Sequence, residues 1–302
     1  MKPRITVITP CLNQALFIER AICSVIDQQY PDLEYFIVDG QSVDGSTRLI
    51  EMYEDDLTAW WSRPDNTPAE AINHALVHAT GQIVLILNAD DVLMPGALDA
   101  AAAKMAKPTG PDWLVGKCMR IDRGDHQTHC VSPVAPGSLG RFLQHDTGML
   151  PSAGSFYRRT ALQRVGLFDA NMHYGYHYEM QCRLFAAGLR PETFDDVVAG
   201  WRESEEPRSA GETLQAGLEF ITAAMRYAHL LRLRQRVELW RNCDRRRRIY
   251  ALAELELSPD DAGSGVWRQI LRHPWWLADV HFRQTLSEGV RHPAPSCLPQ
   301  AA

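Results

Sequence analysis

Long apolar segments are missing from this chain of 302 residues. No stretch of about 18 consecutive apolar residues occurs, so we expect no membrane-spanning helix. The apolar stretch after the first four residues is too short for the core of a signal peptide. The seven cysteines form no C-x-x-C pair and are odd in number, which argues against a disulfide framework and a zinc site. These absences predict a cytoplasmic protein with reduced thiols.

Two nucleotide-binding signatures are also missing. After the first predicted strand the chain reads Thr-Pro-Cys-Leu-Asn at residues 9–13, where a hydride-transferring enzyme would have G-x-G-x-x-G. A P-loop lysine motif is absent as well, so NAD and ATP chemistry are poorly supported. The same five residues lack the Gly-rich, basic loop that a sugar-phosphate nucleotidyltransferase needs.

Positive charge is scarce in the first two thirds of the chain. The net charge is −6, and residues 1–205 hold 17 Lys/Arg against 26 Asp/Glu, whereas residues 206–302 hold 14 against 11. Arginines gather within 226–248, which is typical either of a solvated helix face or of contact with an anionic membrane or a lipid diphosphate. The change in character predicts a first domain over 1–206 and a helical, basic C-terminal extension over 207–302.

Apolar strands and amphipathic helices alternate along the first domain. Short apolar runs at residues 5–8, 35–38 and 83–87 predict strands. Helical spacing follows Asn13, and a capping box with Thr67 as N-cap and proline at the first helical position starts another helix. This alternation predicts an α/β fold, with a mostly parallel sheet flanked by helices on both faces.

Acidic residues follow the ends of these predicted strands. The strand at 83–87 reads as buried on both faces, and Asn88 and Ala89 lead from it to the pair Asp90 and Asp91. Ligands of open α/β sheets bind outside the carboxyl ends of the strands, so the pair is placed to bind a divalent cation and its phosphates. Asp39 ends the second predicted strand and could accept a hydrogen bond from a base or a ribose. An acidic turn that only caps a helix is the simpler alternative for Asp90 and Asp91.

Several short motifs occur along residues 1–205. They include Thr-Pro-x-x-Asn at residues 9–13, Val-Asp-Gly-x-Ser-x-Asp-Gly-Ser at 38–46 and Leu-Asn-Ala-Asp-Asp at 87–91. Further motifs lie at 71–73, 79–81 and 95–98. In their order and spacing they resemble the family 2 glycosyltransferases, which are inverting enzymes with the GT-A nucleotide-diphospho-sugar fold.

The resemblance implies a donor site. Asp39 would bind uracil or another base, with Pro10 and Asp44 shaping the same pocket, and a C-terminal segment with Arg202 and Arg208 would fold over the diphosphate. Asp90 would bind Mn²⁺ or Mg²⁺, supported by Asp91. The full set of implied nucleotide-sugar contacts is Pro10, Asn13, Asp39, Asp44, Asp65, Asn73, Asn88, Ala89, Asp90, Arg202 and Arg208.

The chain departs from the family's pattern at two positions. Asn88 replaces the first acid of the D-x-D element, which removes one charge from the ion site. The general base of the family is usually an Asp six residues before an Arg, and counting back from Arg183 gives His177. Either His177 or Glu179 must then take the proton of the acceptor. We expect Glu179, because a buried carboxylate is the commoner solution.

The resemblance implies an inverting, metal-dependent transferase of surface-polysaccharide biosynthesis. It would move a sugar from a nucleotide-sugar donor, such as a UDP-sugar, to a saccharide or lipid-linked acceptor. We expect a cytoplasmic location with peripheral contact to an anionic membrane at the inner face, and no nucleic-acid partner. The departures at Asn88 and His177 leave one alternative, a nucleotide-sugar-binding protein of the same fold with weak or no turnover.

Overall fold

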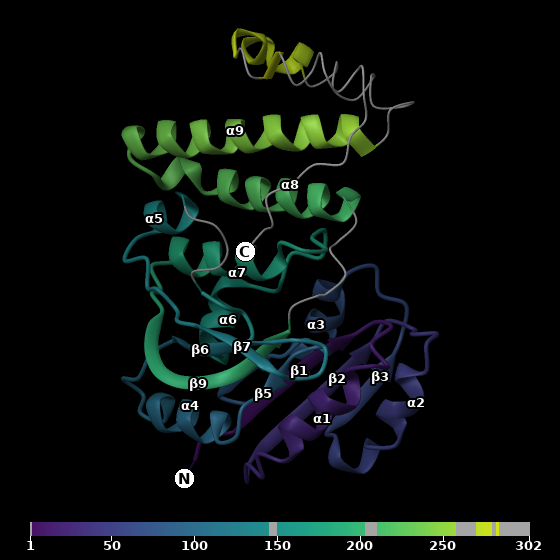
Figure 1. Cartoon of the computed structure of the whole chain (residues 1–302). Coiled ribbons are helices and arrows are strands. Elements are labelled where there is room, and N and C mark those ends of the chain that lie inside the picture. Colours follow the sequence, from purple (N-terminus) through teal and green to yellow (C-terminus); the bar gives the residue numbers. More distant parts are fainter. Residues whose placement is uncertain (1, 145–149, 203–209, 258–269, 280–281, 284–302) are drawn as a thin grey trace. The chain divides into compact units, whose positions relative to one another are not determined.

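The computed structural model describes residues 2–144, 150–202, 210–257, 270–279 and 282–283 (Figure 1). The chain divides into two compact units, Met1–Glu205 and Glu206–Ala302. The domain boundary predicted at residues 206 and 207 lies outside the described residues, and so does Arg208.

Four parallel strands form one half of the sheet in the first unit. Their order is β3-β2-β1-β4. The strand predicted from residues 83–87 is β4, and every residue of it is buried, because apolar side chains point to both faces. The four strands are β1 (Ile5–Cys11), β2 (Leu33–Asp39), β3 (Ala59–Ser62) and β4 (Ile83–Ile86).

The other half of the sheet is mixed. β8 (Ser155–Arg158) pairs antiparallel with both β4 and β6 (Trp113–Ile121). β9 (Glu192–Arg202) runs parallel to β6 and antiparallel to β5 (Val92–Leu93). β7 (Gln127–Val131) forms a hairpin with β6. Because β5 follows directly after Asp91, its pairing brings the end of β9 next to the acidic turn.

Helices cover both faces of the parallel half (Figure 1). Ile5, Val7 and Ile37 share one apolar cluster with residues of α1 and α4, whereas α3 contacts β1 and β2 without joining that cluster. The helices of this unit are α1 (Ile18–Ile26), α2 (Ser46–Glu51), η1 (Glu54–Asp56), α3 (Pro68–Leu76), α4 (Ala97–Met105), α5 (Leu139–Gln144), α6 (Arg159–Val165) and α7 (Tyr176–Ala186). The predicted α/β architecture is confirmed.

The start of α3 follows the predicted capping chemistry. The Thr67 side chain accepts a hydrogen bond from the Glu70 amide at 3.2 Å, and Pro68 occupies the first turn. The Glu70 carboxylate accepts from the Asn66 amide at 2.8 Å, one residue earlier than in a standard capping box. These bonds fix the chain just before α3, where Asp65 lies.

A buried carboxylate ties the start of the sheet to the end of the α3 segment. Glu34 is 7% exposed and accepts from the Thr6 hydroxyl at 2.5 Å and from the Thr80 hydroxyl and amide, both at 2.8 Å. Burial pushes the pKa of Glu34 upward, but these hydrogen bonds outweigh it and hold the pKa below its ordinary value.

The second unit consists of helices in its described part. α8 packs on α9, and Trp276 is fully buried in a small cluster with Ala251, Ile270 and Phe282. Among the described residues, no helix has the length and apolarity needed to cross a membrane. The helices are α8 (Ala210–Arg226), η3 (Ala228–Leu230), α9 (Leu233–Leu257) and η4 (Pro274–Ala278).

Candidate functional site

Pro10, Asp39 and Asp90 lie at or just beyond the carboxyl ends of three parallel strands. The register pairs Pro10 with Val38 and Cys11 with Asp39, so β1 and β2 end side by side. β4 lies on the other side of β1, and Asp90 follows it. The loops after these three neighbouring strands therefore open at one edge of the sheet, where ligands of α/β folds bind.

Asn13 joins the loop after β1 to the loop after β2. Its amide N–H donates to the Ser42 hydroxyl at 2.8 Å, and its side-chain oxygen accepts from the Val43 amide at 3.0 Å. Asn13 has a φ of 53°, in the left-handed region that asparagine tolerates better than most residues. This residue therefore shapes the edge of the site through the backbone of both loops.

Asp44 fixes the same two loops from the other side. One carboxylate oxygen accepts from the Ala15 amide at 2.8 Å, and the other accepts from the Ser46 amide at 3.0 Å and its hydroxyl at 2.6 Å. Although slight burial acts to raise the pKa of Asp44, these bonds lower it. Asp44 thus shapes the loops, and its carboxylate oxygens are already engaged by protein donors.

Asp39 is fully buried at the end of β2. Its Oδ2 accepts from the Ser62 hydroxyl at 2.7 Å, the Thr47 hydroxyl at 3.1 Å and the Ser42 amide at 3.1 Å. Oδ1 receives only a long bond of 3.4 Å, from the same Ser42 amide. A carboxylate oxygen can accept two hydrogen bonds, so Oδ1 retains capacity for a ligand donor.

Asp65 is a buried acceptor without a hydrogen bond. Its side chain is 4% exposed, and neither carboxylate oxygen accepts a hydrogen bond from the described residues. Burial raises the pKa of Asp65, and the negative charges of Glu70 and Asp39 raise it further. Arg63, whose Nε lies 3.2 Å from Asp65 Oδ1, acts to lower it. Buried polar atoms are normally hydrogen-bonded, so the two Asp65 carboxylate oxygens could accept hydrogen bonds from a ligand. The sequence analysis missed Arg63, whose only signal is its position two residues before Asp65.

Asn73 is engaged within the protein. Its side-chain amide donates to the Phe168 carbonyl at 2.8 Å, and its side-chain oxygen accepts from the Phe168 amide at 2.8 Å. The Asn73 side chain thus joins α3 to the segment before α7 through two hydrogen bonds with the Phe168 backbone. A nucleotide contact at Asn73 would have to displace one of these bonds.

The acidic turn after β4 contains one buried and one part-exposed carboxylate. Asp91 is 1% exposed; its Oδ1 accepts from the Arg202 amide at 2.9 Å and its Oδ2 from the Asn88 side chain at 3.2 Å. Burial and the neighbouring Asp90 raise the pKa of Asp91 well above its ordinary value. Both oxygens of Asp91 accept hydrogen bonds from protein donors, so these bonds compete with the predicted metal contact of Asp91.

The residues around Asp90 fit a weak ion site. Among the described residues, no group of three or more His, Cys, Asp or Glu side chains could hold a metal ion. Mg²⁺ in proteins often binds one or two carboxylates and completes its shell with water and substrate phosphates. Asp90 and the Asn88 oxygen, which accepts from the Tyr176 hydroxyl at 3.3 Å, suit such a site. Ala89 between them is 2% exposed and belongs to the core.

Arg202, the arginine predicted to contact the diphosphate, is buried among protein partners. Its side chain is 3% exposed, and its Nε donates to the Asp90 carbonyl at 2.6 Å. The remaining guanidinium nitrogens bind the Asp122 carbonyl and the Asp125 carboxylate, and the guanidinium lies 4.6 Å from the Phe17 ring centroid. Arg202 thus ends β9 and holds the backbone of the acidic turn, and a diphosphate contact at its guanidinium would have to replace one of these partners.

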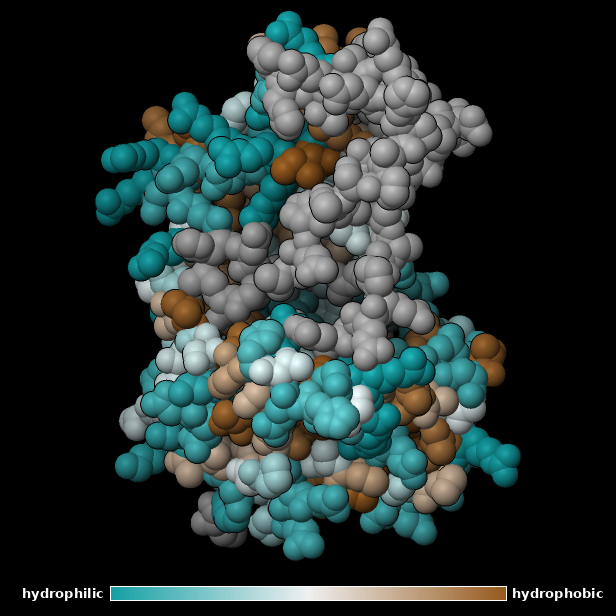
Figure 2. Space-filling model, in the orientation of Figure 1, coloured by the Kyte–Doolittle hydropathy of each residue, from teal (hydrophilic) through white to brown (hydrophobic). Residues whose placement is uncertain are grey.

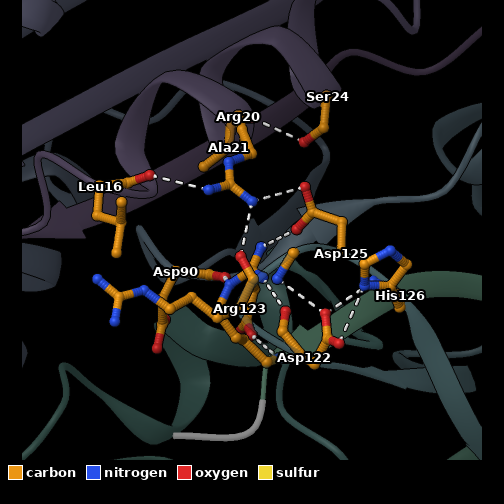
Figure 3. Close-up of polar contacts among 12 residues, drawn as sticks. Leu16, Arg20, Ala21, Ser24, Asp90, Asp122, Arg123, Asp125 and His126 are labelled. Atoms are coloured by element: carbon orange, nitrogen blue, oxygen red, sulfur yellow. Dashed lines mark hydrogen bonds and ion pairs between the residues drawn. The ribbon is translucent and has the colours of Figure 1, made fainter. Parts of the chain in front are cut away.

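Asp125 links this arginine to the loop after β1. Its second oxygen accepts from Arg20 at 2.8 Å, and Arg20 also donates to the Arg123 carbonyl at 2.9 Å and to the Leu16 carbonyl at 3.3 Å. Figure 3 shows Arg20 on α1 pointing at Asp125 in the turn between β6 and β7. No sequence signal could reveal this connection, because the partners are 105 residues apart.

His177, the first candidate base, lies in the first turn of α7. Neither of its ring nitrogens has a hydrogen-bond partner among the described residues. Its ring packs 4.4 Å from the Tyr176 ring and 5.8 Å from the Phe168 ring, centroid to centroid. Burial lowers the pKa of His177 to about 3, so the imidazole is neutral at pH 7 and is a weak base until a nearby anion raises this value.

Glu179, the second candidate base, is buried in an ion pair. It is 2% exposed, and its Oε2 lies 2.9 Å from both Nε and Nη2 of Arg183. Arg183 also donates to the Val165 carbonyl at 3.0 Å. Both candidates belong to α7, where two residues correspond to a rotation of about 200°. They therefore cannot present their side chains to the same point.

Comparison with known sequences gives one family. The family model for "Glycosyl transferase family 2" matches residues 6–166. An "Uncharacterized glycosyltransferase Rv1514c" of Mycobacterium tuberculosis is 27% identical over 177 residues, which cover 55% of this chain and 63% of the relative. The "GalNAc(5)-diNAcBac-PP-undecaprenol beta-1,3-glucosyltransferase" of Campylobacter jejuni is 29% identical over 127 residues, or 41% and 40% of the two chains. The match thus spans less than two thirds of either relative.

Comparison with solved structures supports the fold. The mannosyltransferase PcManGT from Pyrobaculum calidifontis, solved in complex with GDP-Man and Mn²⁺, superposes with a TM-score of 0.60. The alignment covers 96% of this chain and 84% of that one at 20% sequence identity. At this identity the likeness shows a shared architecture, and the ligands of that protein are not transferred to this chain.

Proposed function

The chain belongs to glycosyl transferase family 2, and on this premise we propose that it transfers a sugar from a nucleotide-diphospho-sugar to an acceptor hydroxyl. One observation carries the proposal: Asp39 ends β2 and Asp90 follows β4, and these two strands flank β1 with their carboxyl ends at one edge of the sheet. The spare acceptor capacity of Asp39 suits a base N–H. Asp65 adds two buried oxygens that accept no hydrogen bond from the described residues, although Arg63 Nε lies 3.2 Å from its Oδ1. A UDP-sugar is our first choice of donor, because the uracil N3–H can donate to such a carboxylate.

The opposite end of the donor would lie at Asp90. Asp90 and the Asn88 oxygen would hold Mn²⁺ or Mg²⁺, which when bound stabilises the negative charge of the departing diphosphate. Arg202 contributes indirectly, since it fixes the Asp90 carbonyl and the Asp91 side chain. With one carboxylate and one amide oxygen from the protein, we expect modest affinity for the metal without donor.

The acceptor side would require a base near the start of α7. The acceptor oxygen attacks the anomeric carbon, the bond to the diphosphate breaks, and inversion follows from attack opposite the leaving group; the proton goes to the base. We now prefer His177 to our sequence-based choice of Glu179, because its ring nitrogens have no hydrogen-bond partner among the described residues, whereas Glu179 binds Arg183. An acceptor bound beside the anionic donor would raise the low pKa of His177 toward the working range.

The acceptor we propose is a saccharide, free or carried on a lipid, in the synthesis of a surface polysaccharide. The Campylobacter jejuni relative supports this choice, because its name specifies a glycan on undecaprenyl diphosphate as its acceptor. We propose a cytoplasmic protein that meets such an acceptor at the inner face of the membrane. The weak ion site and the engaged Arg202 favour one alternative, a nucleotide-sugar-binding protein without turnover.

A donor panel separates the two functions. UDP- and GDP-sugars, each with Mn²⁺, Mg²⁺ or EDTA, are scored by thermal shift and by slow release of free sugar. A donor present at 100 times its dissociation constant stabilises the fold by about 2.7 kcal/mol, so a true donor raises the melting temperature measurably, and more with metal. Metal-dependent hydrolysis supports the transferase. Binding without hydrolysis or transfer, for every donor and acceptor tried, would support the alternative.

A further inference from the structure

The first turns of α9 expose an apolar stripe. Leu233, Val237 and Trp240 follow one another at spacings of four and three, which places them on one side of the helix. Their exposed fractions are 68%, 39% and 42%. Leu230, just before the helix, is 51% exposed. Apolar side chains at this spacing normally face a core, so the stripe is the side of α9 that needs a partner.

A neighbouring segment extends the stripe with a second tryptophan. The Trp275 ring lies 5.9 Å from the Trp240 ring and is 46% exposed. Buried Asp244 of α9 holds the segment in place, because it accepts from the indole N–H of Trp275 at 3.2 Å and of Trp276 at 2.9 Å. The α9 stripe, defined as Leu233, Val237, Trp240 and Trp275, is therefore held by specific contacts and still exposes its rings.

Arginines border the α9 stripe on both sides. With about 100° of rotation per residue, Arg234 and Arg241 lie to one side of Leu233 and Arg236 to the other. All three are exposed. Residues 230–248 hold eight arginines and only two acidic residues, Glu238 and Asp244. On the visible face of the second unit, hydrophobic residues lie among strongly hydrophilic ones (Figure 2).

We propose that the α9 stripe and its flanking arginines bind the surface of a membrane that contains anionic lipids. Apolar residues of such a helix enter the boundary between headgroups and acyl chains, tryptophans favour this depth, and arginines pair with lipid phosphates. A two-fold contact with a second copy fits less well, because it would bring the same arginine-rich patch against itself. Membrane contact does not depend on the proposed function, but if that function holds, the contact gives the protein access to a lipid-linked acceptor.

Co-sedimentation of the full chain with vesicles tests the surface. We expect binding to phosphatidylcholine vesicles that contain phosphatidylglycerol, little binding to phosphatidylcholine alone, and release at high salt. Arg234→Gln, Arg236→Gln and Arg241→Gln together should weaken binding on the order of 100-fold, at about fivefold for each arginine near an anionic surface. Leu233→Ser with Val237→Ser should reduce it by about 100-fold or more, the loss expected for two aliphatic side chains buried at the interface.

Two matched controls make the result specific. Val77→Ser removes an equally exposed aliphatic side chain (63%) from the first unit, and Arg141→Gln removes an exposed arginine there; both should bind vesicles like the parent. Asp90→Asn should also bind normally, so the inference can hold even where the proposed transfer fails. Absence of binding to anionic vesicles at low salt overturns the inference. It is equally overturned if the stripe variants bind like the parent, or if sedimentation velocity shows an oligomer that they dissociate.

Discussion

Replacing Glu179 by Gln should destabilise the first unit strongly, independently of any catalytic role. The substitution leaves Arg183, whose side chain is 19% exposed, without the carboxylate at 2.9 Å. Removing one partner of a buried ion pair costs about 3–5 kcal/mol, which in a unit of this size lowers the melting temperature by roughly 6–20 °C. Circular dichroism or differential scanning fluorimetry of the parent and of Glu179→Gln measures this shift directly.

The double variant separates stability from chemistry. Glu179→Gln with Arg183→Met removes both charges, so most of the lost free energy of unfolding should return, as it does when other buried pairs are replaced by apolar side chains. If Glu179 only stabilises α7, the double variant also recovers sugar transfer. If Glu179 is the base, the double variant folds stably and stays inactive.

His177→Asn completes the comparison. Neither ring nitrogen has a hydrogen-bond partner in the described part of the chain, so this change should alter the melting temperature little. It should reduce turnover on the order of 100-fold or more, the range for lost acid–base catalysis. An unchanged melting temperature of Glu179→Gln would refute the buried ion pair. Parental turnover of His177→Asn would refute the histidine as base.

Three further changes test other parts of the structure. Asp125→Asn should weaken metal-dependent donor binding by about tenfold, because it removes roughly 1.4 kcal/mol of charged hydrogen bonding that holds Arg202. Calorimetry without metal should show unchanged nucleotide affinity. An equal loss of affinity with EDTA would contradict this role of Asp125. Hydrogen bonds lower the pKa of Glu34 despite its burial, so Glu34 stabilises the fold above its unfolded pKa of about 4.3 and loses this contribution as the pH falls through its lower folded value. Glu34→Gln should therefore reduce the dependence of the free energy of unfolding on pH at acid pH. An unaltered pH dependence would contradict the assignment. Thr67→Ala should cost about 1 kcal/mol in urea unfolding because α3 loses its N-cap, and a cost near zero would show that the cap is dispensable.

Three of the four parallel strands, β1, β2 and β4, were predictable because each carries a local apolar run, whereas β3 was not predicted. The run at 83–87 is apolar throughout, and the start of α3 has a cap, a proline and a glutamate in sequence. Asp39 and Asp90 could be placed on one edge from strand ends alone, since parallel neighbours end together.

The other half of the site depends on distant contacts. β9 alternates poorly, with charged residues at Glu192, Asp195 and Asp196, and β5 has only two residues, so neither showed a strand pattern. The partners of Arg202 lie 77 to 112 positions away in the sequence, so the sequence does not show that this arginine is buried. The environments of Glu179 and His177 likewise depend on how α7 packs, which the sequence does not reveal. Glu179 is buried in an ion pair with Arg183, whereas the ring nitrogens of His177 have no hydrogen-bond partner among the residues that the structure describes.

The central claim, that Asp90 binds the metal that holds a donor diphosphate, is tested most directly by calorimetric titration of the donor identified in the panel. The parent, Asp90→Asn and the exposed-surface control Asp55→Asn are each titrated with Mn²⁺ and with EDTA. We predict that Asp90→Asn loses the Mn²⁺-dependent part of the binding free energy while its melting temperature stays within about 2 °C of the parent, as for other substitutions outside the core, and that Asp55→Asn behaves like the parent. Full Mn²⁺-dependent binding by Asp90→Asn would contradict the claim.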